Sequence, residues 1–174
     1  MKLRTLMKIG VMFCVNHFFA GTWAFGVKRK LLRFVGYEIG EGTRVVGPMF
    51  CTGALRIGRD CWIGRDFTVN GNGTLVIGDR CDIAPSVMFL TGGHGIGDEN
   101  RRAGKGEAYT IQVHDGTWIG ARSTVAKNVT VGRSSVIAAC ACVVSDVPDN
   151  TLAGGVPAKV IRELSNEPQE DIKQ

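Results

Sequence analysis

The chain has 174 residues, which fits one domain or one domain with an appendage, and its formal net charge is +5. The charge is concentrated at one end, because residues 1–37 hold seven basic and no acidic side chains, whereas the rest of the chain holds fourteen basic and sixteen acidic ones. The body of the protein is therefore close to neutral, which argues against a basic surface for binding nucleic acid.

Residues 1–37 are predicted to form a basic, apolar helical segment. The seventeen residues from Ile9 to Phe25 carry no charge, which is at the short limit for a helix that spans a membrane. Basic residues directly after this stretch argue against a signal peptide. Three interpretations stay open: a cap on the end of the following domain, a helix on an anionic membrane surface, or a short membrane anchor. We expect an interfacial cap helix, with peripheral contact to the inner membrane face through residues 1–35 as a second hypothesis.

Residues 38–155 are predicted to form an all-β solenoid, because an apolar residue recurs at every sixth position. With one two-residue slip and one interruption, sixteen positions follow this period: Ile39, Val45, Cys51, Ile57, Ile63, Val69, Leu75, Ile77, Ile83, Phe89, Val113, Ile119, Val125, Val131, Ile137 and Val143. A period of six fits neither a helix of 3.6 residues per turn nor a simple hairpin. It fits a solenoid in which each hexapeptide forms one flat side with the apolar residue inward. The next residue is often glycine or alanine, and we expect it to supply the unusual dihedral angles of the bend.

The six cysteines suggest a disulfide framework or a zinc site, but their spacing supports neither. The chain contains no Cys-x-x-Cys pair, and Cys140-x-Cys142 with three scattered histidines lacks the spacing of zinc ligands. Cys51 falls at an inward position of the repeat, and Cys61 and Cys81 fall at a small-residue position four places after an inward one. We therefore expect buried thiols that act as compact fillers, no metal requirement, and a cytoplasmic location.

Two segments depart from the repeat. Between Leu90 and Gln112, a glycine, an arginine and a glutamate stand where an apolar residue is due. We expect an extruded loop over residues 91–112. Residues 156–174 are expected to form a short C-terminal helix, beginning after Pro157, and a polar tail.

Four stretches together resemble the hexapeptide-repeat acyltransferases: Ile77-Gly-Asp-Arg-Cys-Asp-Ile-Ala-Pro-Ser-Val, Thr91-Gly-Gly-His94, Trp118-Ile-Gly-Ala, and Asp146-Val-Pro-Asp-Asn through Ala153-Gly-Gly-Val-Pro-Ala-Lys-Val-Ile-Arg162. Their order is similar to that in maltose and galactoside acetyltransferases, and the loop residues after Gly97 are similar to those of bacterial polysaccharide O-acetyltransferases. The resemblance implies a left-handed parallel β-helix with triangular coils. It also implies a homotrimer with active sites between subunits, with a dimer of trimers as the alternative.

His94, at the root of the expected loop, is the candidate catalytic base. Acetyl transfer from a thioester to a hydroxyl needs a proton acceptor that works near neutral pH, which suits histidine. The residue pattern alone favours a solvated loop histidine, whereas the resemblance of Thr91–His94 to the family assigns the general base. Asp66 or Asp98 is expected to orient the ring, and spacing does not choose between them.

The resemblance further implies that acetyl-CoA lies in the groove between two neighbouring columns. Residue-by-residue matching assigns its contacts to Trp118, Ala121, Ala139, Val144, Ser145, Lys159 and Arg162. Val144 and Ser145 stand where relatives often have threonine and lysine, so one phosphate contact is altered. Lys159 and Arg162 match positions that meet the nucleotide phosphates, and basic side chains suit that contact. Without the resemblance, these two residues are equally well explained as a solvated pair.

The acceptor is not expected to be a simple galactoside, because Gly64 and Asn72 stand where galactoside-type relatives carry sugar-contacting asparagine and aspartate. The candidates for contact with a saccharide acceptor are Asp66, Asn72 and Asp98. The leading prediction is an acetyl-CoA-dependent O-acetyltransferase that acts on a sugar of a surface polysaccharide or its precursor. The alternatives are N-acetylation of an amino sugar or an antibiotic, and a non-catalytic solenoid scaffold.

Overall fold

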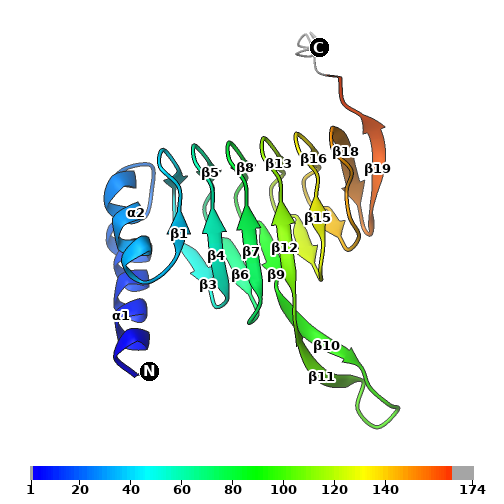
Figure 1. Ribbon diagram of the computed structural model, residues 1–174, viewed down its shortest axis with the longest axis horizontal. Coiled ribbons are helices and arrows are strands. Elements are labelled where there is room, and N and C mark those ends of the chain that lie inside the picture. The colour runs from blue at the N-terminus through cyan, green and yellow to red at the C-terminus, as the bar shows by residue number, and fades with distance from the viewer. Residues whose placement is uncertain (1, 166–174) are drawn as a thin grey trace.

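The protein is a parallel β-solenoid of about six turns with helices packed on its first coil (Figure 1). The computed structural model describes residues 2–165, with side chains from residue 5 onward. In Figure 1 the coils follow one another along the long axis, the helices cover one end, and a hairpin projects from one edge. The solenoid predicted from the six-residue period is confirmed.

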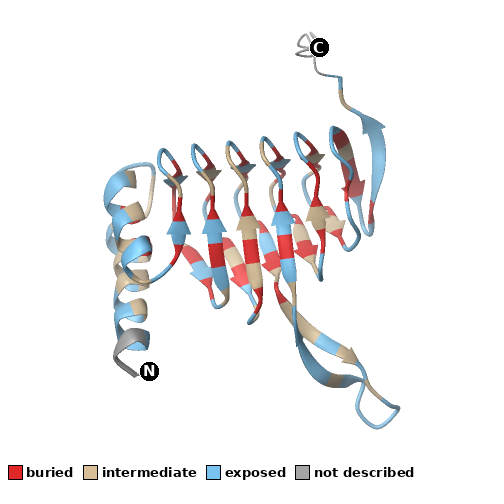
Figure 2. Ribbon diagram, viewed as in Figure 1, coloured by how far each residue is buried: buried red, intermediate tan, exposed pale blue. Residues whose placement is uncertain are grey.

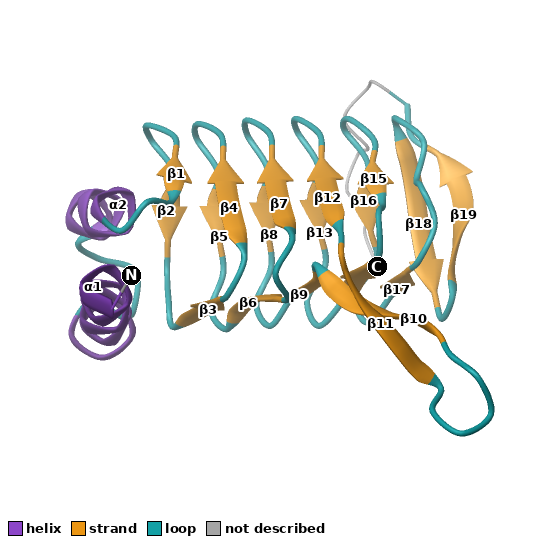
Figure 3. Ribbon diagram, turned by 60° about the horizontal axis from the view of Figure 1, so that its bottom comes forward, coloured by secondary structure: helices purple, strands orange, loops and turns teal. Residues whose placement is uncertain are grey.

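Three sheets run along the column and make it a prism, which Figure 3 shows from a second side. Sheet A contains β1 (Glu38–Ile39), β4 (Ala54–Ile57), β7 (Thr74–Ile77), β12 (Thr110–Val113) and β15 (Thr130–Val131). Sheet B contains β2 (Arg44–Val45), β5 (Trp62–Ile63), β8 (Asp82–Ile83), β13 (Trp118–Ile119), β16 (Val136–Ile137), β18 (Thr151–Gly155) and β19 (Ala158–Glu163). Sheet C contains β3 (Met49–Cys51), β6 (Phe67–Asn70), β9 (Met88–Leu90), β14 (Thr124–Ala126) and β17 (Cys142–Val143). The chain visits the sheets in the order A, B, C, so the prism has an A–B corner, a B–C corner and a C–A corner.

The core consists of stacks of apolar side chains inside the prism, contributed by all three sheets. All sixteen positions of the six-residue period are buried, and they form the red bands of Figure 2 on the strands. Because equivalent residues pair between parallel coils, as Ile63 does with Ile83, each inward side chain stacks on its counterpart. Two buried phenylalanines of the core, Phe67 and Phe89, lie with ring centroids 5.7 Å apart.

Glycine serves a different purpose at the bends than expected. The left-handed backbone falls three residues after the inward position, at residues such as Asp60 (φ 55°) and Arg80 (φ 54°). The glycine directly after the inward position instead permits close stacking, because a Cβ added to Gly58 would lie 2.5 Å from the carbonyl oxygen of Gly78 in the next coil. The expectation that this glycine supplies the unusual dihedral angles is therefore wrong.

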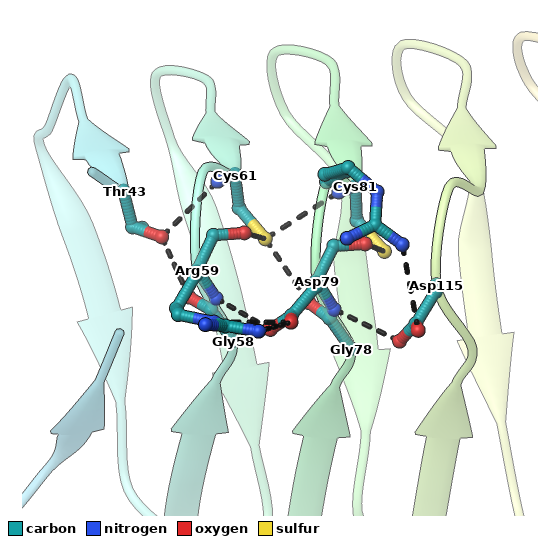
Figure 4. Close-up of polar contacts among 9 residues, drawn as sticks. Thr43, Gly58, Arg59, Cys61, Gly78, Asp79, Cys81 and Asp115 are labelled. Carbon is teal, nitrogen blue, oxygen red and sulfur yellow. Dashed lines mark hydrogen bonds and ion pairs between the residues drawn. The ribbon is translucent and has the colours of Figure 1, made fainter. Parts of the chain in front are cut away.

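Small polar side chains form a hydrogen-bonded ladder inside the A–B corner (Figure 4). The Thr43 hydroxyl donates to the Gly58 carbonyl at 2.6 Å and accepts from the Cys61 amide at 3.1 Å. The Cys61 thiol repeats this pattern with the Gly78 carbonyl at 3.1 Å and the Cys81 amide at 3.4 Å. The contact with the Cys61 thiol and burial raise the pKa of Cys81. The buried-filler interpretation of Cys61 and Cys81 is confirmed, and each thiol also links two coils.

Basic side chains of α2 (Phe25–Phe34) cover the open end of the first coil on two of its sides. No coil precedes this one, so its outward carbonyl groups need other donors. Arg33 Nε donates to the Ile39 carbonyl (2.6 Å), and Arg29 Nη1 donates to the Thr43 carbonyl (3.1 Å). Lys28 Nζ donates to the Val46 carbonyl (3.1 Å) and also to the Gly21 carbonyl in the segment before the coil (2.7 Å). The Lys28 side chain is fully buried, and burial lowers its pKa to about 8.

Uncharged side chains cover the third side. The helix α1 (Lys2–Phe13) continues into a π-helical turn (Cys14–Phe18), which brings Asn16 to the edge of β3. The Asn16 amide donates to the Met49 carbonyl at 2.8 Å and accepts from the Met49 amide at 2.9 Å, as a neighbouring strand would. The Tyr37 hydroxyl donates to the Cys51 carbonyl at 2.9 Å. The basic N-terminal segment is therefore a cap that replaces the missing coil on all three sides.

The expected helix after Pro157 is wrong for the residues that the structure describes. Residues 158–163 form β19, which turns back at Val156–Pro157 and pairs antiparallel with β18. The last strand of sheet B would otherwise present an open edge, and β19 supplies its hydrogen-bond partner. The polar tail beyond residue 165 lies outside the described residues.

Candidate active site

The segment that breaks the repeat is an ordered hairpin at the C–A corner. It consists of β10 (Gly92–Ile96) and β11 (Ala103–Ala108), which pair antiparallel. At its base the Tyr109 amide donates to the Thr91 carbonyl at 2.8 Å, and Thr91 is buried. The extruded segment therefore ends at residue 109, and residues 110–112, expected in the loop, belong to β12 of sheet A.

His94 lies on β10 opposite Gly106, with its ring held by a backbone carbonyl. The Nδ1 atom lies 2.8 Å from the Gly104 carbonyl oxygen. A carbonyl oxygen only accepts hydrogen bonds, so in the neutral ring Nδ1 carries the proton and Nε2 keeps its lone pair. The expected carboxylate partner, Asp66 or Asp98, is thus replaced by a main-chain group.

The His94 ring borders an open cleft of about 510 Å³. The cleft is lined by Gly71, Asn72, Gly92, Gly93, His94, Gly106, Glu107 and Ala108. Most of these residues have no side chain or a methyl group, so the hairpin leaves space beside the ring for a bulky acceptor. Asn72, a predicted substrate contact, shares this cleft with His94.

Glu107 also lines the cleft, although the residue pattern did not single it out as a functional residue. Its carboxylate accepts a hydrogen bond from the Tyr109 hydroxyl, with 3.1 Å between Tyr109 Oη and Glu107 Oε2. Partial burial, followed by the neighbouring carboxylate, raises the pKa of Tyr109. The only signal in the sequence was that Glu107 stands where an apolar residue was due.

The two other predicted substrate residues lie away from the cleft. Asp98 is at the exposed tip of the hairpin, where its carboxylate accepts from the amides of Asn100 and Arg101 at 2.9 and 3.1 Å. Asp66 sits at the B–C corner with φ 56°, and its amide donates to the Pro48 carbonyl. Neither residue lines the space beside His94.

Three of the residues predicted to contact acetyl-CoA gather along sheet B and the B–C corner. Trp118, on β13, has an exposed fraction of 54%. Ala121 and Ala139 follow one another in adjacent coils, because the Cys140 amide donates to the Ala121 carbonyl at 2.9 Å. A flat exposed ring beside methyl side chains leaves backbone groups accessible, which suits a long, narrow ligand.

Of the remaining four, two lie at the C–A corner and two on the last strand of sheet B. Val144 and Ser145 follow β17 at the C–A corner, and both are exposed. Lys159 and Arg162 are exposed on β19 and pair with Gly154 and Leu152 of β18. Two cations on one exposed strand fit the phosphate groups of a nucleotide.

One chain therefore brings together His94 and Asn72 but keeps them apart from the acetyl-CoA candidates of sheet B and the B–C corner. Within residues 2–165, no group of three or more histidine, cysteine, aspartate or glutamate side chains is placed to hold a metal ion.

Comparison with known proteins identifies a family to which this chain is similar. The model "Bacterial transferase hexapeptide (six repeats)" matches residues 110–145. The galactoside O-acetyltransferase of Escherichia coli strain K12 is 32% identical over 141 residues, which are 80% of this chain and 70% of the relative.

Two solved structures extend this result. A hexapeptide-repeat acetyltransferase of Vibrio cholerae O1 biovar eltor, in complex with acetyl coenzyme A, superposes with a TM-score of 0.83 at 28% identity and covers 95% of this chain and 89% of its own. A polySia-specific acetyltransferase has a TM-score of 0.63 at 29% identity and covers 75% of this chain and 62% of its own. The parallel coils, the hairpin that carries His94 and these similarities show that the chain belongs to the hexapeptide-repeat acetyltransferases.

Proposed function

We propose that the protein transfers an acetyl group from acetyl-CoA to a hydroxyl of a sugar in a surface polysaccharide or its precursor, with His94 as general base. The observation that carries this proposal is the 2.8 Å contact of His94 Nδ1 with the Gly104 carbonyl, which leaves Nε2 as the proton acceptor beside an open cleft. Glycine-lined space around the ring suits a saccharide, which brings several hydroxyls and its own bulk.

The proton path follows from the ring orientation. Acetyl-CoA supplies an activated thioester when bound. His94 Nε2 accepts the proton of the acceptor hydroxyl, whose oxygen forms the new ester bond. The Gly104 carbonyl stabilises the resulting imidazolium through Nδ1, and the proton on Nε2 then passes to the departing sulfur.

An acceptor screen with acetyl-CoA tests this function. Free thiol release and mass-detected acetylation of saccharide hydroxyls would support it, and acetylation of amines alone would favour the N-acetyltransferase alternative. CoA binding without transfer to any acceptor would favour a scaffold. The similarity to a polySia-specific acetyltransferase supports including acidic polysaccharides in the screen.

We also propose that the complete site forms between two copies in a homotrimer. His94 projects from the C–A corner, whereas Trp118, Ala121 and Ala139 lie on sheet B and at the B–C corner. A single prism presents these groups on different edges. Parallel packing of neighbouring columns would let one copy supply the base and the next supply the acetyl-CoA contacts.

Mixing two inactive variants tests this arrangement. His94→Ala removes the base, and Ala139→Trp fills the groove at an exposed corner. In trimers assembled at random from equal amounts, a site formed between subunits is intact in about one quarter of cases. We therefore expect activity near that fraction of wild type after co-assembly, measured by thiol release. A site made within one subunit would give none.

The cytoplasmic location and the peripheral membrane contact remain proposals. None of the helices in residues 2–165 has the length and hydrophobicity needed to cross a bilayer. The cap nevertheless exposes Phe13, Phe18 and Phe34, and exposed aromatic side chains suit insertion at a lipid interface. We expect Phe13→Gln with Phe34→Gln to reduce sedimentation with anionic vesicles severalfold. Equal sedimentation of the double variant and wild type would contradict membrane contact.

A further inference from the structure

A second cleft, apolar and about 360 Å³ in volume, lies between α1 and the edge of β3. Its lining consists of Thr5, Lys8, Ile9, Met12, Asn16, Met49, Phe50, Cys51 and Thr52. The α1 residues follow a helical spacing, so a single face of the helix forms one wall. Ligand sites have this size and this apolar character with few polar groups.

The polar groups of this cleft are mostly accounted for. Both ends of the Asn16 amide bind Met49. Burial raises the pKa of the Cys51 thiol, which stays protonated and behaves as an apolar group. Lys8 is half-buried with Nζ 4.6 Å from the centre of the Tyr37 ring, and no carboxylate among residues 5–165 forms an ion pair with it. The cleft therefore offers apolar walls and one cation.

The apolar cleft and the His94 cleft lie along the same corner of the prism. Thr52, from the first, accepts from the Gly71 amide at 2.9 Å and donates to the Gly71 carbonyl at 2.8 Å, and Gly71 lines the second. The hairpin leaves the column two coils after Thr52, a separation of about 10 Å at the spacing of β-strands. Figure 1 shows the N-terminal end of α1 and the hairpin extending beyond the column on the same side.

We propose that the cleft between α1 and β3 binds an apolar group carried by the saccharide acceptor, with Lys8 facing an acidic linkage between the two. This inference rests on the proposed function, because it places the sugar hydroxyl at His94. A sugar ring together with the acidic linkage spans the distance between the clefts. The substrate class is then an anionic glycoconjugate with an apolar tail rather than a free sugar.

The test compares the methyl and octyl glycosides of one accepted sugar, below the micelle-forming concentration. We expect the octyl glycoside to have a kcat/KM about tenfold higher, mainly through KM, because its chain is removed from water. Ile9→Gln should reduce this preference to about twofold. Leu6→Gln is the matched control, since Leu6 is on the same helix and equally exposed (64% against 62% for Ile9) but does not line the cleft.

Equal kcat/KM for the two glycosides would overturn the proposal while leaving the acetyltransferase intact. So would equal effects of the Ile9 and Leu6 variants. If the acceptor screen finds no accepted sugar, the proposed function fails, and ligand binding alone tests the cleft. The anionic fluorophore 1-anilinonaphthalene-8-sulfonate should then bind the wild type, lose at least threefold in affinity in Ile9→Gln and Lys8→Gln, and keep its affinity in Leu6→Gln. Identical affinities in the four proteins would overturn the subsite.

Discussion

Replacing His94 with alanine is expected to lower the rate of acetyl transfer by about 10²–10⁴-fold, the usual contribution of a positioned general base. The side chain is exposed, and its described hydrogen bond joins it only to Gly104 of the same hairpin. Its loss should therefore leave the thermal unfolding transition in place. Thiol release from acetyl-CoA with an accepted saccharide, together with circular dichroism, measures both quantities.

His114→Ala is the matched control for this variant. His114 is also exposed, but it lies at the A–B corner directly after the inward residue Val113. We expect its activity to remain within twofold of wild type. Similar losses in both variants, or full activity of His94→Ala, would show that His94 is not the base.

Replacing Lys28 with methionine is expected to lower the free energy of unfolding by about 2–4 kcal/mol, since the Gly21 carbonyl then loses the ammonium donor and the Val46 carbonyl keeps only the Gly21 amide. Chemical denaturation measures the change. Lys30→Met is the matched control, because Lys30 lies on the same helix with an exposed side chain, and its effect should stay within about 0.5 kcal/mol. Equal effects of the two substitutions would mean that Lys28 does not cap the first coil.

Comparing wild type with Lys28→Met at different pH values also reports on the titration of Lys28. Burial lowers the pKa of its ammonium group to about 8 from 10.5. Below pH 8 both the folded and the unfolded chain hold the proton, so the cost of burying the charge is fully present. Between pH 8 and 10.5 the unfolded chain binds more protons, and the stability of wild type should rise relative to Lys28→Met. A difference that stays constant across this range would contradict the lowered pKa.

The fold could be predicted from the sequence because each flat side of the solenoid has one residue that points inward, and these residues recur at every sixth position. Even the two-residue slip has a structural counterpart. Ile57 pairs with Ile77, and the extra residues lie at Gly71–Gly73 of the C–A corner. A bend at a corner can lengthen without disturbing the stacked strands on either side.

The final segment could not be predicted from local rules. A proline followed by Ala-Lys-Val-Ile-Arg is compatible with the first turn of a helix, but the open edge of β18 provides hydrogen-bond partners that a helix would leave unused. The open edge of β18 therefore decides between strand and helix, and the sequence of residues 158–163 alone does not reveal that edge.

The environment of His94 was likewise only partly predictable. The histidine and Asn72 could be identified from the sequence, and the structure places both in one cleft. The partner of the ring was missed, because every residue carries a carbonyl group and the hairpin register selects that of Gly104. Among side chains, a carboxylate is the usual partner of a histidine ring, and this is why the sequence pointed to Asp66 or Asp98.

The side-chain cap on the first coil also bears on how the protein avoids assembling without limit. A stack of identical coils has no intrinsic length, and an uncovered first coil would offer three parallel strand edges to the strands of another molecule. Side chains occupy those hydrogen-bonding positions instead, and a further strand cannot pair with a side chain. These residues are Lys28, Arg29, Arg33, Asn16 and Tyr37. The N-terminal segment thus acts as a terminator of end-to-end polymerisation. Truncating it exposes a template for fibre growth.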